Sequence, residues 1–227
     1  MQPVGVPVPG WTAREPPPRT AMEGSYCRVE MLEARHADEL YAAYEGAADN
    51  WTYLAQEPPA HFSAYLAWVE KVAAGSDPLF HAVIGKESGR TVGIAALMRI
   101  DTANGVIEVG NINYAPALQR SRAGTEAIFL LMRRVFDELG YRRFEWKCDS
   151  LNAASRRAAM RYGFTFEGIF RQAVMYKGRN RDTAWYSIIN REWPGLKERY
   201  ARWLEPANFD AKGRQRMSLG AFLGGDG

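Results

Sequence analysis

The sequence has little cysteine and no long apolar run. Only two of its 227 residues are cysteine, Cys27 and Cys148, and they are too far apart for the paired spacing of a metal site. Isolated cysteines are typical of buried thiols in a reducing compartment. No apolar stretch approaches the ~20 residues that cross a membrane, and residues 1–20 lack the charged start and apolar core of a signal peptide. We therefore expect a cytoplasmic protein with no membrane segment and no metal.

The sequence also lacks a strong charge of either sign. Its formal net charge is +3, which by itself does not favour nucleic acid as a partner. No internal repeat of ~20–50 residues is present, and this excludes solenoids and propellers. The hydrophobic fraction of 47% is enough to build a core.

Proline and glycine are concentrated at the two ends of the chain. Residues 1–24 should form an extended arm, because proline fixes φ and lacks an amide proton, and apolar side chains such as Trp11 could pin this arm to the body. Residues 204–227, with five glycines from Gly213 onward, should form a loose tail. Residues 25–203 are expected to form one domain between them.

Strand-like and helix-like periods alternate within this domain. We expect strands at 26–32, 80–85, 91–100, 106–112, 143–148, 164–176 and 183–189, and helices at 37–45, 61–74, 152–162 and 193–203. The dipeptide Asn104-Gly105 predicts a hairpin, and the polar run from Lys177 to Asp182 predicts a solvated turn. That run could alternatively attract an acidic acceptor or a phosphate.

The clearest helix lies in the middle of the domain and ends before Gly140. Its apolar residues recur at helical spacing, with arginines and glutamates opposite, at Ile128, Leu131, Met132, Val135, Phe136 and Leu139. Together the elements predict an α/β fold, with a mixed, mostly antiparallel central sheet flanked by helices.

The segment that leads into this helix is rich in hydrogen-bond donors. A helix N-terminus is an anion-binding site, because its first amide groups are unpaired and its dipole is positive there. Arg120 and Arg122 add guanidinium groups that can bind phosphate oxygens, and Gln119, Ser121 and Thr125 add polar contacts. A solvated helix start with ordinary caps is the alternative.

This arrangement resembles the GNAT acetyltransferase superfamily, and within it the RimJ/RimL-like branch. The stretch Gln119-Arg-Ser-Arg-Ala-Gly124 is similar to the family's acetyl-CoA signature, Gln/Arg-x-x-Gly-x-Gly/Ala. Asn152, Ser155 and the pair Gly163-Phe164 resemble the following motif, and the similarity covers about Tyr26 to Trp193. It implies acetyl-CoA as cosubstrate. The residues it implies for acetyl-CoA binding are Ile112, Asn113, Tyr114, Gln119, Arg120, Ser121, Arg122, Ala123, Gly124, Thr125, Asn152 and Ser155.

The sequence departs from the family pattern at two positions. Arg122 stands where the family has its first glycine, which allows the backbone to approach the pyrophosphate. Ala159 stands where many members have a tyrosine that acts as general acid. These departures support a second hypothesis, a degenerate domain that binds CoA or a partner without turnover.

The resemblance implies direct attack of a primary amine on the thioester carbonyl. Glu108 would serve as general base, Ser155 would replace the missing acid, and a backbone N–H near Ile112 to Tyr114 would stabilise the oxyanion. The acceptor pocket would include Trp51, Tyr53 and Glu108. Structural alternatives remain for each, namely an exposed strand carboxylate for Glu108, a first-turn helix residue for Ser155 and a helix cap for Asn152.

The identity of the acceptor amine stays open at this stage. It could be a protein N-terminus or a small molecule, and a nucleic-acid-associated protein is a third, less favoured reading. A homodimer is a further expectation, with the helix at 193–203 and the tail as its contact.

Overall fold

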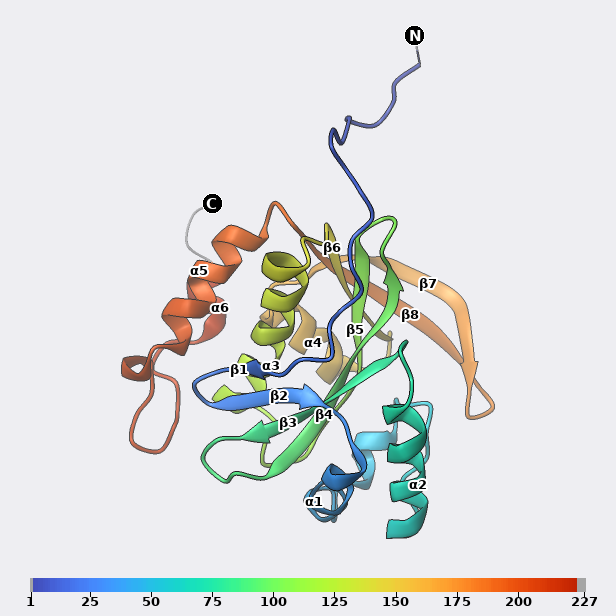
Figure 1. The fold of residues 1–227 in the computed structure, drawn as a ribbon, viewed down its shortest axis with the longest axis vertical. Helices are drawn as coiled ribbons and strands as arrows, with labels where there is room; N and C mark the ends of the chain where they lie inside the picture. The colour runs from blue at the N-terminus through green and yellow to red at the C-terminus, as the bar shows by residue number, and fades with distance from the viewer. Residues whose placement is uncertain (1, 224–227) are drawn as a thin grey trace.

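The computed structural model describes residues 2–223 as an eight-stranded sheet with helices on both faces (Figure 1). The strands are β1 (Met22–Glu23), β2 (Cys27–Met31), β3 (Leu79–Gly85), β4 (Thr91–Asp101), β5 (Val106–Tyr114), β6 (Arg143–Asp149), β7 (Thr165–Tyr176) and β8 (Arg179–Ile189). The α-helices are α1 (Ala37–Ala43), α2 (Phe62–Ala73), α3 (Arg122–Arg133), α4 (Ala153–Arg161), α5 (Trp193–Leu204) and α6 (Leu219–Leu223). Short 3-10 turns lie at Ala34–His36, Ala48–Trp51 and Pro206–Asn208.

The strand order is β1-β2-β3-β4-β5-β6-β8-β7, and every neighbouring pair is antiparallel except β5 and β6. That pair is parallel because α3 carries the chain from the end of β5 back to the start of β6. The predicted α/β fold with a mixed, mostly antiparallel sheet is therefore confirmed. None of the helices described for this chain is long and apolar enough to cross a bilayer.

Helices cover both faces of the sheet, so the protein has two apolar cores. On one face α1 and α2 lie over β3 and β4, and on the other α3 and α4 lie over the sheet with α5 packed on α3 (Figure 1). Successive residues of β4 point into the two cores in turn. Ile94 and Ala96 belong to the first core, under α1 and α2, and Ala95 and Leu97 belong to the second core, under α3 and α4.

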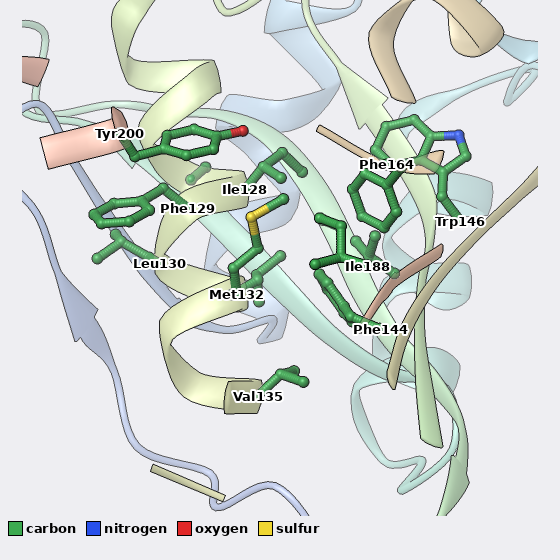
Figure 2. Packing of buried hydrophobic residues seen from close by; sticks show 14 of the residues in the cluster. Ile128, Phe129, Leu130, Met132, Val135, Phe144, Trp146, Phe164, Ile188 and Tyr200 are labelled. Carbon is green, nitrogen blue, oxygen red and sulfur yellow. The ribbon is translucent and has the colours of Figure 1, made fainter. Parts of the chain in front are cut away.

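The predicted apolar stripe of α3 lies in the second core, where Ile128, Met132 and Val135 are fully buried (Figure 2). On the far side of the helix, the ring of Phe129 stacks on that of Tyr200 from α5, with centroids 5.0 Å apart. This side of α3 is covered in part by α5. The α-helical part ends at Arg133 and continues as a π-helical turn over Arg134–Glu138, so the helix ends before Gly140, whose φ is 65°, as predicted.

Two hairpins differ in detail from the prediction. The Asn104-Gly105 hairpin is confirmed, but its turn is longer than two residues, because β4 ends at Asp101 and β5 begins at Val106. The turn predicted from Lys177 to Asp182 was wrong, because only Lys177 and Gly178, with φ of 50° and 68°, form the turn and β8 already begins at Arg179. Polar residues are tolerated at the start of β8 because this hairpin lies at the exposed edge of the sheet.

The loose tail predicted from residue 204 onward was wrong for its described part. Phe209 and Leu219 are buried in the core that α3 and α5 share, and Asn208 accepts a hydrogen bond from the amide of Met217 at 2.9 Å. Gly224, Gly225 and Gly227 lie outside the described residues. This part of the tail is ordered because it supplies apolar side chains that complete this core.

The N-terminal arm is held against the body from Trp11 onward. The indole of Trp11 donates to the carbonyl of Ala103 at 2.8 Å, and its ring contacts Gly105, where a Cβ atom would lie only 2.4 Å from a ring carbon. Farther along, the guanidinium of Arg134 donates to the carbonyls of Pro18 and Thr20. The arm then enters the sheet as β1, a strand that the sequence did not predict.

Candidate active site

The sheet opens between its two parallel strands. Only Val106–Val109 of β5 and Arg143–Trp146 of β6 pair with each other. Beyond this pairing, β5 continues to Tyr114 and β6 continues to Asp149. Within the described chain, residues 110–114 therefore have no strand partner on the β6 side. A ligand commonly binds where the carboxyl ends of parallel strands diverge, and we call this opening the seam.

A bulge in β5 lies at the seam. Gly110 pairs with Ala96 and Asn113 pairs with Ile94, so two residues of β5 lie opposite one residue of β4. Asn111, in this bulge, has a φ of 48°. Such a bulge bends the strand and re-aims its side chains, which turns the end of β5 away from β6.

The turn from β5 into α3 is closely packed. Ser121 caps the helix, since its hydroxyl accepts a hydrogen bond from the amide of Gly124 at 2.9 Å and donates to the carbonyl of Leu118 at 2.7 Å. Gly124 is buried, and a Cβ atom there would lie 2.5 Å from the carbonyl oxygen of Leu118. This second glycine of the signature is required by the fold of the turn, and the free amides of the helix start fit an anionic group.

The two signature arginines point in different directions. Arg122 lies with its guanidinium carbon 4.4 Å from the ring centroid of Tyr26, and it forms an ion pair with Glu87 at 3.8 Å. Its side chain therefore packs on the residue before β2 and on Phe209 of the tail, whose ring centroid is 5.7 Å away. Arg120 is exposed and has a φ of 55°, a left-handed backbone conformation that is uncommon for residues other than glycine.

Gln119 braces the end of β5. Its amide donates to the carbonyl of Tyr114 at 2.9 Å and to the side chain of Asn50 at 3.0 Å. Asn50 in turn donates to the side chain of Asn113 at 2.9 Å, and the hydroxyl of Tyr44 donates to the Asn113 carbonyl at 2.7 Å. The sequence did not predict the roles of Asn50 and Tyr44. They lie 63 and 69 positions before Asn113, and no local motif marks contacts over such separations.

Ser155 and Asn152 lie at the start of α4, next to the end of β6. Asn152 caps the helix by accepting the amide of Ser155 at 2.9 Å, as its structural alternative predicts. The hydroxyl of Ser155 accepts a hydrogen bond from the indole of Trp146 at 2.9 Å. Cys148 is buried nearby, and burial raises the pKa of its thiol, which does not favour a nucleophilic role.

Glu108 is buried within a charge network. Its side chain is 3% exposed, and its carboxylate lies 2.8 Å from Arg99 and 3.1 Å from the ammonium of Lys147. Lys147 also pairs with Glu145 at 2.7 Å. Burial raises the pKa of Glu108, while the charges of Lys147 and Arg99 oppose the shift. The alternative of an exposed strand carboxylate is therefore wrong.

Glu108 and Ser155 lie on opposite faces of the sheet. Ile107 and Val109 belong to the core under α3, so Glu108 between them faces the α1 and α2 side. Ser155 belongs to α4, on the other face, beside Trp146 of the same core. The two candidate catalytic groups thus approach the seam from opposite sides.

A cavity of about 270 Å³ lies on the α1 and α2 side. Its lining residues come from the segment before α2, from α2 itself and from β3, β4 and β5, and they are Trp51, Leu54, Gln56, Glu57, Pro58, Pro59, Ala60, Ala64, Tyr65, Trp68, Phe80, Ile94, Asn111 and Asn113. Of the residues predicted for the acceptor pocket, only Trp51 lines this cavity. Tyr53 instead donates its hydroxyl to the carbonyl of Leu151 at 3.3 Å.

The tip of the β7–β8 hairpin closes one side of this region. Lys177 donates to the carbonyl of Trp51 at 2.7 Å and pairs with Glu57 at 3.3 Å. The hydroxyl of Tyr176 donates to Asp149 at 2.9 Å. Lys177 thus turns inward, which also contradicts the predicted solvated turn, and it connects two segments 126 residues apart.

The general acid of many family members has no direct counterpart. Ala159, at that position, is fully buried. Tyr162 packs against Trp146 with ring centroids 5.9 Å apart, and burial raises the pKa of its hydroxyl. Residues 2–223 contain no group of three or more His, Cys, Asp or Glu side chains placed to hold a metal ion.

The comparisons with known proteins agree with this fold. The model of the acetyltransferase (GNAT) domain family matches residues 28–165. A GCN5-related N-acetyltransferase from Brucella melitensis is 52% identical, with a TM-score of 0.93 over 95% of this chain and 99% of its own. A Chromobacterium violaceum structure, provisionally assigned to GNAT acetyltransferases, is 39% identical, with a TM-score of 0.79 over 86% of this chain and 98% of its own.

A curated relative agrees as well. The Bacillus subtilis protein YdaF, provisionally named a ribosomal N-acetyltransferase, is 26% identical over 188 residues, which cover 78% of this chain and 99% of the relative. The family model matches more than half of the chain, and this match decides the assignment. The resemblance to the RimJ/RimL-like branch is confirmed, and the chain is an enzyme of the GNAT acetyltransferase family.

Proposed function

We propose that this enzyme transfers an acetyl group from acetyl-CoA to a primary amine by direct attack on the thioester. The observation that carries this proposal is the open seam, which Glu108 approaches from one face of the sheet and Ser155 from the other. A thioester held in the seam would meet the amine on the cavity side, and its thiolate would leave on the α4 side.

The helix start and the signature turn support binding of acetyl-CoA. The unpaired amides at the beginning of α3 suit a diphosphate, and the close packing at Gly124 keeps them in place. Arg122 is engaged with Tyr26, so we assign phosphate contacts to the backbone amides and to Arg120 rather than to Arg122. The other predicted ligands are Ile112, Asn113, Tyr114, Asn152 and Ser155, proposed contacts of the pantetheine arm and thioester, and Ser121, Ala123 and Gly124, proposed contacts of the phosphates through the helix start. Gln119 holds the end of β5, and Thr125 is 1% exposed with its hydroxyl bonded to the Ser121 carbonyl at 3.1 Å, so neither is assigned a ligand contact.

Backbone groups of β5 supply the proposed oxyanion site. Beyond Val109 the strand has lost β6 as its partner within the described chain, so amides directed at the seam are free to donate. Donors fixed in this way stabilise charge that develops on the carbonyl oxygen.

Glu108 is the proposed base and Ser155 the proposed acid. An alkylamine has a pKa near ~10.4, so it must lose a proton before attack. Glu108 would accept that proton through water, and its raised pKa makes it a stronger base than an exposed carboxylate. The Ser155 hydroxyl accepts from Trp146, so its own proton can pass to the departing thiolate while a water molecule returns a proton to the serine oxygen.

The test is thiol release from acetyl-CoA in the presence of small amines and of peptides with free N-termini. The proposal predicts thiol release that depends on the amine, and a rise in melting temperature with acetyl-CoA. Binding without release with any amine would instead support the degenerate domain. Salt-dependent binding of DNA or RNA would be needed to favour the nucleic-acid reading.

We also propose that the protein forms a homodimer, but through β7 rather than α5. The apolar residues of α5, including Trp193, Tyr200 and Trp203, are buried within the chain. β7 is an edge strand, and its exposed apolar side chains include Phe170 and Met175. Two such edges can pair about a twofold axis. A Met175→Asp variant should be monomeric by light scattering if this edge forms the contact.

A further inference from the structure

The cavity beside α2 is larger and more apolar than attack by a simple amine requires. Four aromatic rings, those of Trp51, Tyr65, Trp68 and Phe80, contribute to its walls. Tyr65 stacks on Trp68 with centroids 5.6 Å apart, and Trp68 meets Phe80 edge to face at 5.7 Å. These contacts hold the walls in place, so the cavity is formed before a ligand enters.

The volume sets the size of the group that could fill it. An engineered apolar cavity of roughly 150 Å³ holds a benzene molecule. At about 270 Å³, this cavity has room for one aromatic ring with a short linker, or for two fused rings. Pockets of this kind bind ligands mainly through apolar contact, with a few polar groups for orientation.

The cavity reaches the strand at which the amine would react. Asn111 and Asn113 of β5 line it, and Asn113 lies in the stretch that faces the seam. A group seated among the aromatic rings would therefore place an attached amine close to the end of β5. Asn111 and Asn113 both lie in the unpaired stretch 110–114 itself, which favours a linker of one or two carbon atoms.

The cavity lining does not favour a positively charged group in addition to Lys177. Its acidic member, Glu57, is mostly exposed and already pairs with Lys177 at 3.3 Å. Tyr65 is 3% exposed, and its hydroxyl has no hydrogen-bond partner of normal geometry among the described residues. A neutral ring fits this lining, because the aromatic walls offer apolar contact.

We infer that the acceptor is a primary amine that carries an aromatic or similarly bulky apolar group, and that this group occupies the cavity. The inference rests on the proposed function and specifies its acceptor. The same chemistry occurs in a small arylalkylamine and in a peptide whose first residue is aromatic, so the experiment contains both.

The experiment compares kcat/KM for 2-phenylethylamine with that for ethylamine, and a Phe-initiated peptide with its Gly-initiated analogue. We expect the aromatic member of at least one pair to be favoured by about tenfold or more. Equal kcat/KM values within both pairs would overturn the inference but leave the proposed function intact. Absence of thiol release with every acceptor would overturn the proposed function.

Two variants of α2 locate the effect. Ala64 lines the cavity and is exposed, so Ala64→Trp should fill the cavity and reduce the preference for the aromatic acceptor by about tenfold. Ala67→Trp is the matched control, because Ala67 is also exposed on α2 but does not line the cavity. An undiminished preference in Ala64→Trp would contradict the inference.

A binding measurement makes the test independent of turnover. With CoA present, 2-phenylethylamine should raise the melting temperature of the parent protein and of Ala67→Trp, and should do so much less for Ala64→Trp. An equal shift in all three proteins would place the ring elsewhere and overturn the inference.

Discussion

The indole N–H of Trp146 donates to the hydroxyl of Ser155 at 2.9 Å, and this bond joins the second core to the seam. Trp146 is buried, so the position of the hydroxyl is set by packing and not by solvent. Because the hydroxyl oxygen is the acceptor, its hydrogen can be directed elsewhere. The geometry suits a donor to a departing thiolate.

Replacement of Ser155 should slow the chemical step. We expect Ser155→Ala to lower kcat by about 10²-fold and to lower stability by about 1–3 kcal/mol, because the Trp146 indole loses its buried acceptor. Ser155→Thr keeps a hydroxyl and should retain most of the rate. Steady-state kinetics and thermal unfolding measure the two effects. A normal kcat in Ser155→Ala would show that the hydroxyl is not the acid.

Glu108→Gln should lower kcat by about 10²-fold while acetyl-CoA still raises the melting temperature. The matched control is Glu145→Gln, since Glu145 is similarly buried and also pairs with Lys147, but it lies on β6. If both variants lose the same activity, the charge network as a whole is responsible and Glu108 is not the base.

The pH dependence of the rate gives a second test of Glu108. Burial raises the pKa of this carboxyl, and it acts as a base only when ionised. The rate should therefore rise with pH, and the midpoint of this rise should lie above the ordinary glutamate pKa of ~4.3. Below that midpoint the carboxyl is protonated and the rate should fall. Glu108→Gln should lose this acidic limb. A profile that is unchanged in the variant would assign the limb to another group.

Gly124→Ala should unfold the signature turn, because its Cβ atom would lie 2.5 Å from the Leu118 carbonyl oxygen. We expect a loss of about 1–3 kcal/mol in stability and of the melting-temperature shift with acetyl-CoA. Gly195→Ala is the control, since Gly195 is also the third residue of its helix but has nothing within 4 Å of a Cβ atom. That change should stabilise the protein by about 0.5–1 kcal/mol. Equal effects in the two variants would contradict the packing argument.

Arg122→Gly restores the glycine of the family signature, and it should not strengthen acetyl-CoA binding appreciably. The guanidinium lies over Tyr26, so its removal should cost about 0.5–1 kcal/mol of stability. Arg122→Lys retains a cation and should lose less. Calorimetric titration with acetyl-CoA and thermal unfolding check these expectations. A large loss of acetyl-CoA affinity in both variants would instead show that Arg122 contacts the ligand.

The N-terminal arm should stabilise the protein only from Trp11 onward. Deletion of residues 2–10, which are exposed, should leave the melting temperature unchanged. Trp11→Ala should lower stability by about 1–3 kcal/mol, because it removes the contact with Gly105 and the hydrogen bond to Ala103. An equal melting temperature for Trp11→Ala and the parent protein would show that the arm adds nothing to the fold.

Local patterns were sufficient for most elements and for the signature turn. The spacing of apolar residues in α3, the turn before Gly124 and the order of the strands around it all depend on neighbours close in the sequence. The short β1 was missed because two residues carry no periodic signal. The start of β8 was missed because polar residues at an exposed edge resemble a turn.

The sequence by itself determined the family resemblance, the order of the main strands and helices and the residue types of the signature turn, because these follow from short-range periodicity and from motifs in a set order. Only the tertiary structure decided how those residues are used. It directed Arg122 onto Tyr26, buried Glu108 beside Lys147 and turned Lys177 toward Trp51. Each of these contacts joins segments far apart in the chain, and its geometry depends on how the sheet, helices and arm pack around it.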